Sequence, residues 1–144
     1  MAMVKRLEME GKIEKIPFDL NTVREAIDIA QRDLYAAEMN LEISDEWTYN
    51  ISYNAVLSAG RALMFSRGYR PKGGEGHVSV KEFLRYYLEQ DDVTAFDRMR
   101  RKRHAATYDV SCIVTHTDAE GALATAKALV STIKVILAND GFVF

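Results

Sequence analysis

Residues 51–64 read Ile-Ser-Tyr-Asn-Ala-Val-Leu-Ser-Ala-Gly-Arg-Ala-Leu-Met, and they lie at the centre of a longer amphipathic segment, 45–66. Ser44 precedes this segment and is a favoured helix N-cap residue. Apolar residues recur along it at helical spacing: Trp47, Ile51, Ala55, Ala59, Ala62 and Phe65, broadened by Val56 and Leu63. The many small residues permit close approach of a neighbouring element. We therefore predict a helix over 45–66, with Arg61 on its polar strip and Gly68 as its left-handed cap.

Similar patterns on either side of this helix predict the rest of the fold. The further helices are expected at 22–41, 80–89, 94–109 and 117–138. Capping boxes fit residues 22–25, 79–82 and 94–97, at the starts of the first three of these helices. The fold class is therefore all-α, an antiparallel up-and-down helical bundle of four long helices and a shorter one. Residues 1–17 are interpreted as an N-terminal arm, with a short extended piece around 12–16. Residues 18–144 are expected to form the helical bundle.

Composition narrows the class of protein. The 144 residues carry a formal net charge of −2, so polyanion binding must use a local patch. The chain has a single cysteine, Cys112, so an internal disulfide is excluded. Its three histidines are far apart in sequence, so we expect no metal site, and no cofactor is expected either. No signal peptide and no apolar stretch near the ~20 residues of a membrane span are recognised. A reduced, cytoplasmic setting without membrane contact is expected.

Residues 98–109 read Arg-Met-Arg-Arg-Lys-Arg-His-Ala-Ala-Thr-Tyr-Asp and form a local basic patch. On a helix, four of these residues share about one third of the circumference: Arg100, Arg103, His104 and Thr107, with Tyr108 just beyond. Such a face can hold phosphate oxygens beside an imidazole. A solvated basic face is the alternative interpretation. The glycine-rich connector 68–77 is likewise either a weak phosphate cradle or a plain link between helices.

Three segments together resemble HEPN domains (higher eukaryote and prokaryote nucleotide-binding). Residues 51–64 are similar to the aromatic-then-alanine helix of that family, 76–83 to its histidine-led helix start, and 103–109 to its Arg-polar-x-Ala-Asp-Tyr signature. The resemblance covers about 22–138. It implies an up-and-down bundle that is often dimeric, with the motif faces of two subunits meeting. It further implies a metal-independent ribonuclease of toxin–antitoxin systems, or a partner of a minimal nucleotidyltransferase or an antitoxin.

The chain departs from the family's nuclease motif, which has an arginine, an adjacent polar residue and a histidine four to six residues after the arginine. With Arg103 as the motif arginine, Tyr108 stands where the histidine is expected. With Arg98 instead, His104 fits but Met99 occupies the polar position. The resemblance leaves three hypotheses open: a module that binds RNA or a nucleotide, an active ribonuclease, or a structural role. The candidate catalytic residues are His104, Arg103 and Tyr108, and those for phosphate binding are Arg98, Arg100, Arg101, Arg103, Arg61 and His77.

Overall fold

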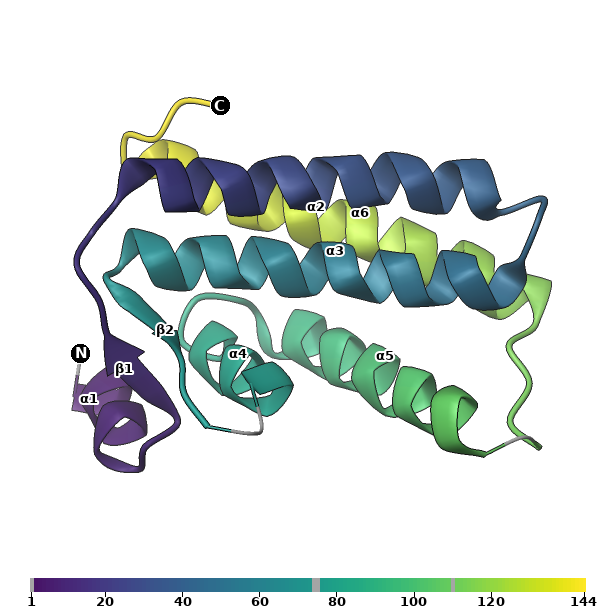
Figure 1. The fold of residues 1–144 in the computed structure, drawn as a ribbon, viewed down its shortest axis with the longest axis horizontal. Helices are drawn as coiled ribbons and strands as arrows, with labels where there is room; N and C mark the ends of the chain where they lie inside the picture. Colours follow the sequence, from purple (N-terminus) through teal and green to yellow (C-terminus); the bar gives the residue numbers. More distant parts are fainter. Residues whose placement is uncertain (1, 74–75, 110) are drawn as a thin grey trace.

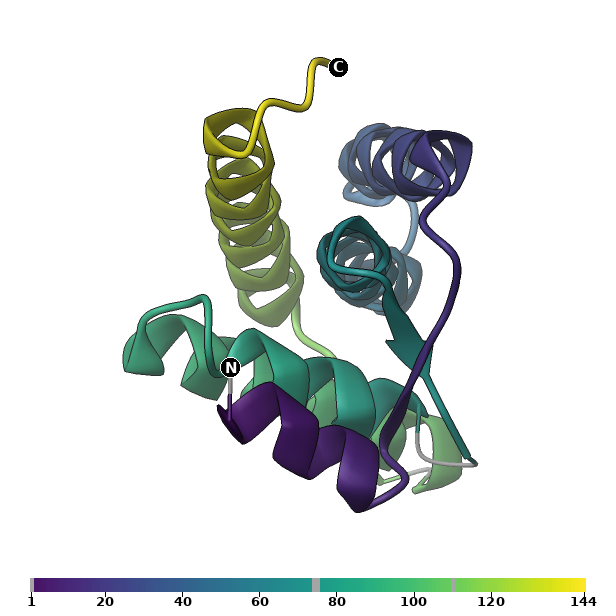
Figure 2. The ribbon, with the colours of Figure 1, turned by 90° about the vertical axis from the view of Figure 1, so that its left-hand side faces the viewer.

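The computed structural model describes residues 2–73, 76–109 and 111–144. Three long helices form the body of the molecule (Figure 1): α2 (Leu20–Asn40), α3 (Asp45–Ser66) and α6 (His116–Asn139). Helix α3 packs against both α2 and α6, and α4 (Gly76–Leu84) and α5 (Gln90–Tyr108) cover its other side (Figure 2). The predicted all-α helical bundle is confirmed.

Helix α3 is the central element because it is buried on most of its circumference. Its N-cap is Ser44, as predicted, and the Ser44 side chain accepts a hydrogen bond from the Trp47 amide. At Gly60 a Cβ atom would lie 2.6 Å from Cγ1 of Val80 on α4. A side chain at this position would therefore force α3 and α4 apart. The predicted close approach along the small residues is thus realised at Gly60.

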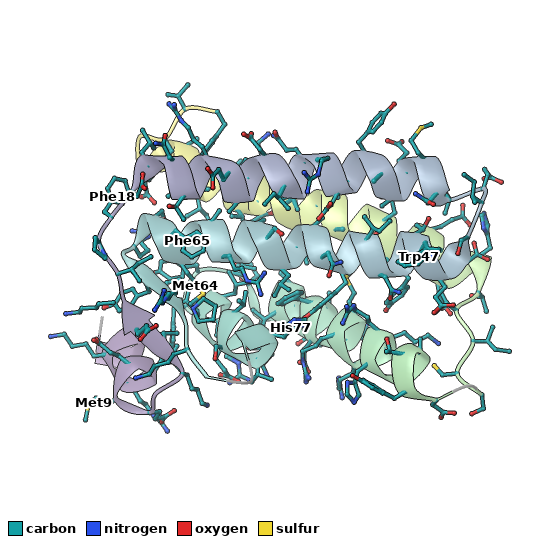
Figure 3. All side chains as sticks on the ribbon, in the orientation of Figure 1. Met9, Phe18, Trp47, Met64, Phe65 and His77 are labelled. Atoms are coloured by element: carbon teal, nitrogen blue, oxygen red, sulfur yellow. The ribbon has the colours of Figure 1, made fainter. Side chains whose placement is uncertain are left out.

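One predicted core residue of α3 is on the surface. The side chain of Trp47 is 62% exposed, and Figure 3 places it near the start of the helix. Thr48, Tyr49 and Ser52 are buried instead. In the first turns of α3 the buried side of the helix therefore differs from the predicted apolar side. The reason is that α3 has neighbours on several sides, so polar side chains also enter the core.

Several helix boundaries differ from the predicted ones. The N-cap of α2 is Asp19, three residues before the predicted Thr22, and its side chain accepts from the Asn21 amide. Helix α4 covers Gly76–Leu84 rather than 80–89, and Ser79 is buried inside it. Helix α5 begins at Gln90 rather than near Thr94. Local capping patterns recur inside helices as well as at their ends, so they did not fix these boundaries.

The N-terminal residues include a helix that was not predicted, α1 (Ala2–Met9). It leads into strand β1 (Ile13–Lys15), which agrees with the extended piece expected around 12–16 and pairs antiparallel with β2 (Tyr69–Pro71). Val4, Leu7 and Ile13 are buried in the same apolar cluster as the bundle. Within the glycine-rich connector, residues 74 and 75 lie outside the described part of the chain.

Helix α6 follows an irregular connector that was predicted to be extended or frayed; residue 110 of it is outside the described residues. A capping box joins Thr115 and Asp118, and its N-cap Thr115 lies two residues before Thr117, the predicted start of the helix. By length and composition α6 is apolar enough to cross a membrane, with a mean hydropathy of 1.5 over 18 residues. No such stretch was recognised in the sequence because Lys127 and Lys134 interrupt the apolar run. Core helices of globular proteins share these properties.

An ion pair joins the beginnings of α3 and α6. Nδ1 of His116 lies 2.7 Å from Oδ1 of Asp45. The hydrogen bond to Asp45 raises the pKa of His116 above its ordinary value of 6.5, with further contributions from the charges of Asp45, Glu120 and Glu42. The pair is half exposed, so its contribution to stability is modest.

This ion pair predicts that the difference in stability between the wild type and a His116→Gln variant depends on pH. A raised folded-state pKa means that the stabilisation is fully present below the unfolded-state pKa and is lost as the pH rises through the folded value. The melting temperature of the wild type should therefore exceed that of His116→Gln at a pH of about 5.5, and the difference should shrink by a pH of about 8.5. A difference that does not change with pH would contradict the role of the imidazolium.

Candidate phosphate-binding cleft

A cleft of about 540 Å³ lies between the start of α4 and the C-terminal half of α5. Figure 3 shows His77 where these two helices come together. The cleft, called here the α4–α5 cleft, is lined by His77, Val78, Arg100, Arg103, His104, Thr107 and Tyr108. The predicted common face of Arg100, Arg103, His104 and Thr107 is therefore confirmed, since all four residues line one cleft.

The floor of the cleft is anchored to the core through Tyr53 of α3. The Tyr53 ring is fully buried, and it stacks on Phe96 with the ring centroids 5.3 Å apart. Its hydroxyl lies 3.0 Å from Nδ1 of His77. Burial raises the pKa of Tyr53 to about 12, although the charge of Arg103 opposes this shift. The phenol is therefore protonated at neutral pH and fixes one ring nitrogen of His77.

His77 is a neutral group in this setting. Burial lowers its pKa below the ordinary value, and the positive charges of Arg103, Arg61 and Arg100 lower it further. Close cations and desolvation both disfavour the imidazolium. At pH 7 His77 therefore offers a neutral imidazole that donates or accepts hydrogen bonds. A net positive charge in the cleft must come from the arginines.

Arg103 is the arginine most firmly attached to the core side of the cleft. Its guanidinium carbon lies 5.5 Å from the centroid of the Tyr53 ring, a cation–π contact. Its Nε is buried and has no hydrogen-bond partner among the described residues. Arg103 is thus positioned by the aromatic ring, and no carboxylate among the described residues pairs with it, which favours an external anion as its partner.

Arg100 is positioned differently. Its Nε donates a 2.9 Å hydrogen bond to Oδ1 of Asp97, and Arg101 and Lys81 also lie near that carboxylate. Burial by itself would raise the pKa of Asp97, but the hydrogen bond from Arg100 and the three neighbouring cations lower it on balance. Asp97 therefore remains ionised and holds Arg100 in place. Part of the Arg100 charge is already balanced within the protein.

The outer wall of the cleft is made by His104 and Tyr108. The centroids of their rings lie 4.7 Å apart, and the angle between the ring planes is 50°. Both side chains face solvent, Tyr108 with 77% of its surface exposed. Rings in this position can contact a nucleobase by stacking. His104 is within the same cleft as His77, so two imidazoles from different helices border the space between the arginines.

The other three predicted phosphate-binding residues do not line the α4–α5 cleft: Arg98, Arg101 and Arg61. Arg98 borders a separate cleft of about 260 Å³ between α5 and α6. Arg101 is exposed and paired with Asp97. Arg61 on α3 is half-buried and does not line the α4–α5 cleft, yet its charge acts on both His77 and Tyr53. The basic run therefore divides around α5, and only part of it is directed into the cleft.

The part that Tyr53 plays in this arrangement was missed in the sequence. Tyr53 was not among the predicted site residues, although it lies on the same helix as Arg61. Its ring is in the core and its hydroxyl meets His77. The sequence feature that could have indicated this role is a tyrosine, Tyr53, on the same side of the helix as Arg61. Tyrosine suits such a border because one end is apolar and the other is polar.

Comparison with known proteins agrees with this architecture. No protein of curated function matches the sequence. A solved structure with similar architecture is TT1696 from Thermus thermophilus, with a TM-score of 0.66 and 19% sequence identity over 79% of this chain and 97% of that one. At this identity the likeness concerns the fold alone. The family model of the HEPN domain matches residues 23–136. The segments that resembled this family at 51–64, 76–83 and 103–109 all lie within that match, and the chain belongs to the HEPN domain family.

Proposed function

We propose that the α4–α5 cleft binds phosphate groups of RNA or of a nucleotide. The observation that supports this most directly is Arg103, a half-buried guanidinium that stacks on Tyr53, without a carboxylate partner in the described part of the chain. Arg100 adds a second cation, and neutral His77 adds a hydrogen-bonding group. A planar guanidinium fork matches phosphate oxygens in geometry and charge. Tyr108 and His104 offer rings for a base.

The proposal is tested by fluorescence anisotropy with labelled single-stranded RNA and with a labelled nucleotide. We expect Arg103→Gln to weaken binding about tenfold and to lower the salt dependence by about one phosphate contact. Arg98→Gln removes the same charge from the same helix, but Arg98 borders a different cleft. It is therefore the matched control and should have a smaller effect. Equal losses in both variants would instead indicate a diffuse basic surface.

Metal-independent cleavage of RNA is a second candidate function, favoured by the two histidines that line one cleft. Cleavage requires a base for the 2′-hydroxyl, an acid for the leaving oxygen and cations for the charged transition state. His104 and His77 are candidates for the proton transfers, and Arg100 and Arg103 for the charge. Tyr108 is the third residue of the predicted catalytic set, with a role in orienting the substrate.

The same RNA samples distinguish binding from cleavage. Incubation in EDTA should yield fragments with 2′,3′-cyclic phosphate ends if the cleft is catalytic, and His104→Ala should reduce the rate about 100-fold or more. RNA that is bound by the wild type and remains intact would assign the cleft to binding alone. Far-UV circular dichroism of His104→Ala is the control for folding, and the exposure of His104 predicts an unchanged spectrum.

The biological setting is also part of the proposal. We propose a cytoplasmic protein that acts in a toxin–antitoxin system or beside a minimal nucleotidyltransferase, as the family resemblance implied. A homodimer with apposed α5 faces would place two α4–α5 clefts near one RNA strand. Sedimentation of the purified protein, alone and with the protein encoded by a neighbouring gene, tests these two assemblies.

A further inference from the structure

A second large concave site, the α2–α6 groove, lies away from the α4–α5 cleft. Its volume is about 570 Å³. Helices α2 and α6 lie on the side of α3 opposite to α4 and α5, and the C-terminal tail emerges beside the end of α6 (Figure 2). The groove has an apolar wall formed by Leu34, Val130, Val135, Phe142 and Phe144. Its volume falls within the range of small-molecule sites, about 300–1,000 Å³.

Apolar surface remains uncovered in this groove. Val135 is 56% exposed and Phe144 is 45% exposed. The rings of Phe142 and Phe144 are almost parallel, with centroids 6.2 Å apart and an angle of 8°. Only 39% of the most apolar window of α6 is buried. Exposed apolar surface that is gathered in a concave site marks a binding site more often than scattered apolar residues do.

Two lysines of α6 border this apolar surface. The ammonium of Lys127 lies 3.1 Å from Oε1 of Glu38 and thus joins α6 to α2. Lys134, two turns further along, makes no ion pair within residues 2–73, 76–109 and 111–144. It is half-buried, so its charge is less screened than that of a fully exposed lysine. The groove therefore combines an apolar body with one unneutralised positive charge.

We propose that the α2–α6 groove binds an amphipathic monoanion, with a hydrocarbon body and a single carboxylate. The hydrocarbon lies along Leu34, Val130 and Val135, and Phe142 and Phe144 close the end of the groove that the C-terminal tail forms. The carboxylate pairs with Lys134. A ligand with a single negative charge fits this groove, because Lys127 is already paired with Glu38 and, of the two lysines, only Lys134 is left to bind it. This proposal does not depend on RNA binding at the α4–α5 cleft.

The test is a ligand titration of the protein, monitored by isothermal titration calorimetry and by amide chemical shifts. Dodecanoate is the probe, and dodecyltrimethylammonium is the comparison probe of opposite charge. We expect saturable binding of dodecanoate, about tenfold tighter than that of the cation. Lys134→Met should weaken dodecanoate binding about fivefold, the upper range for a partly exposed ion pair. Lys5→Met, on the distant helix α1 (Figure 1), is the matched control and should leave the affinity unchanged.

A second variant tests the apolar part of the groove. Ser131 lies on the exposed face of α6 and lines the groove, so Ser131→Trp places an indole in the ligand space without entering the core. This variant should lower dodecanoate affinity at least about tenfold through steric exclusion. Equal affinity for both probes, or unchanged affinity in Ser131→Trp, would overturn the proposal.

Phosphatidylglycerol vesicles distinguish a free amphiphile from a membrane surface. Protein that binds free dodecanoate below its micelle concentration and does not sediment with vesicles supports the proposal. Protein that sediments with the vesicles and shows no saturable site for dodecanoate would overturn it in favour of an anionic membrane surface. Loss of RNA binding in Arg103→Gln would change neither result, because Arg103 belongs to α5, and α5 lies on the other side of α3 from the groove (Figure 2).

Discussion

Replacement of the fully buried Tyr53 by alanine (Tyr53→Ala) is expected to lower the free energy of unfolding by about 4 kcal/mol, since loss of a large buried aromatic leaves a cavity. The ring stacks on Phe96, and it also lies under the guanidinium of Arg103. The variant should therefore lose both core packing and the attachment of the α4–α5 cleft. Urea unfolding followed by circular dichroism measures the first effect.

Two variants make this result specific. Tyr35→Ala removes the same atoms from a side chain that is 66% exposed, and should change stability by no more than about 0.5 kcal/mol. Tyr53→Phe retains the ring and removes only the hydroxyl next to His77, so it should lower stability by about 1 kcal/mol. If Tyr53→Ala were no more destabilising than Tyr35→Ala, the ring would not be the anchor that its burial indicates.

The variant Gly60→Val is expected to destabilise the protein by about 3 kcal/mol, at the upper end of the range for overpacking a core. A Cβ at this position would lie 2.6 Å from Cγ1 of Val80 and 3.2 Å from Cδ1 of Leu84. Both neighbours are fully buried on α4, so neither has free space to move into. The strain should separate α4 from α3 and thereby displace His77 at the start of α4.

Gly121 of α6 provides the matched comparison. It is also a helical glycine, but a Cβ there would meet nothing within 4 Å. Gly121→Val should therefore leave stability within about 0.5 kcal/mol, because valine is a slightly better helix former than glycine. Thermal unfolding of both variants tests the contrast. Equal destabilisation of the two variants would mean that the loss at Gly60 does not come from contact between α3 and α4.

Local patterns predicted the features that depend on neighbours in sequence. The helix at 45–66, its Ser44 cap and the left-handed Gly68 were all predicted, and Gly68 has a φ of +79°. The common face of Arg100, Arg103, His104 and Thr107 was predicted as well, since positions on one helix are fixed by its 3.6-residue period. The start of α5 and the helix α1 were not, because capping signals and short apolar patterns are weak without tertiary contacts.

The composition of the cleft required knowledge of contacts between distant segments. Tyr53, His77 and Arg103 come from three helices, and the first two are 24 residues apart in the chain. No local rule connects them. The same packing places Arg98 at another cleft, although it stands only five residues before Arg103. A 3.6-residue period distinguishes the sides of a helix but does not indicate which side meets a neighbour.

The amino-acid sequence by itself determined that this protein is a helical bundle of the HEPN family with one strongly basic helix. The tertiary structure alone decided which cations are paired with a carboxylate and which residues surround them. Helical periodicity arises from contacts within a few residues, so it can be recognised in the sequence. The charge balance of Arg103 and Lys134 depends on which carboxylates other helices bring near, and only the packed chain determines that.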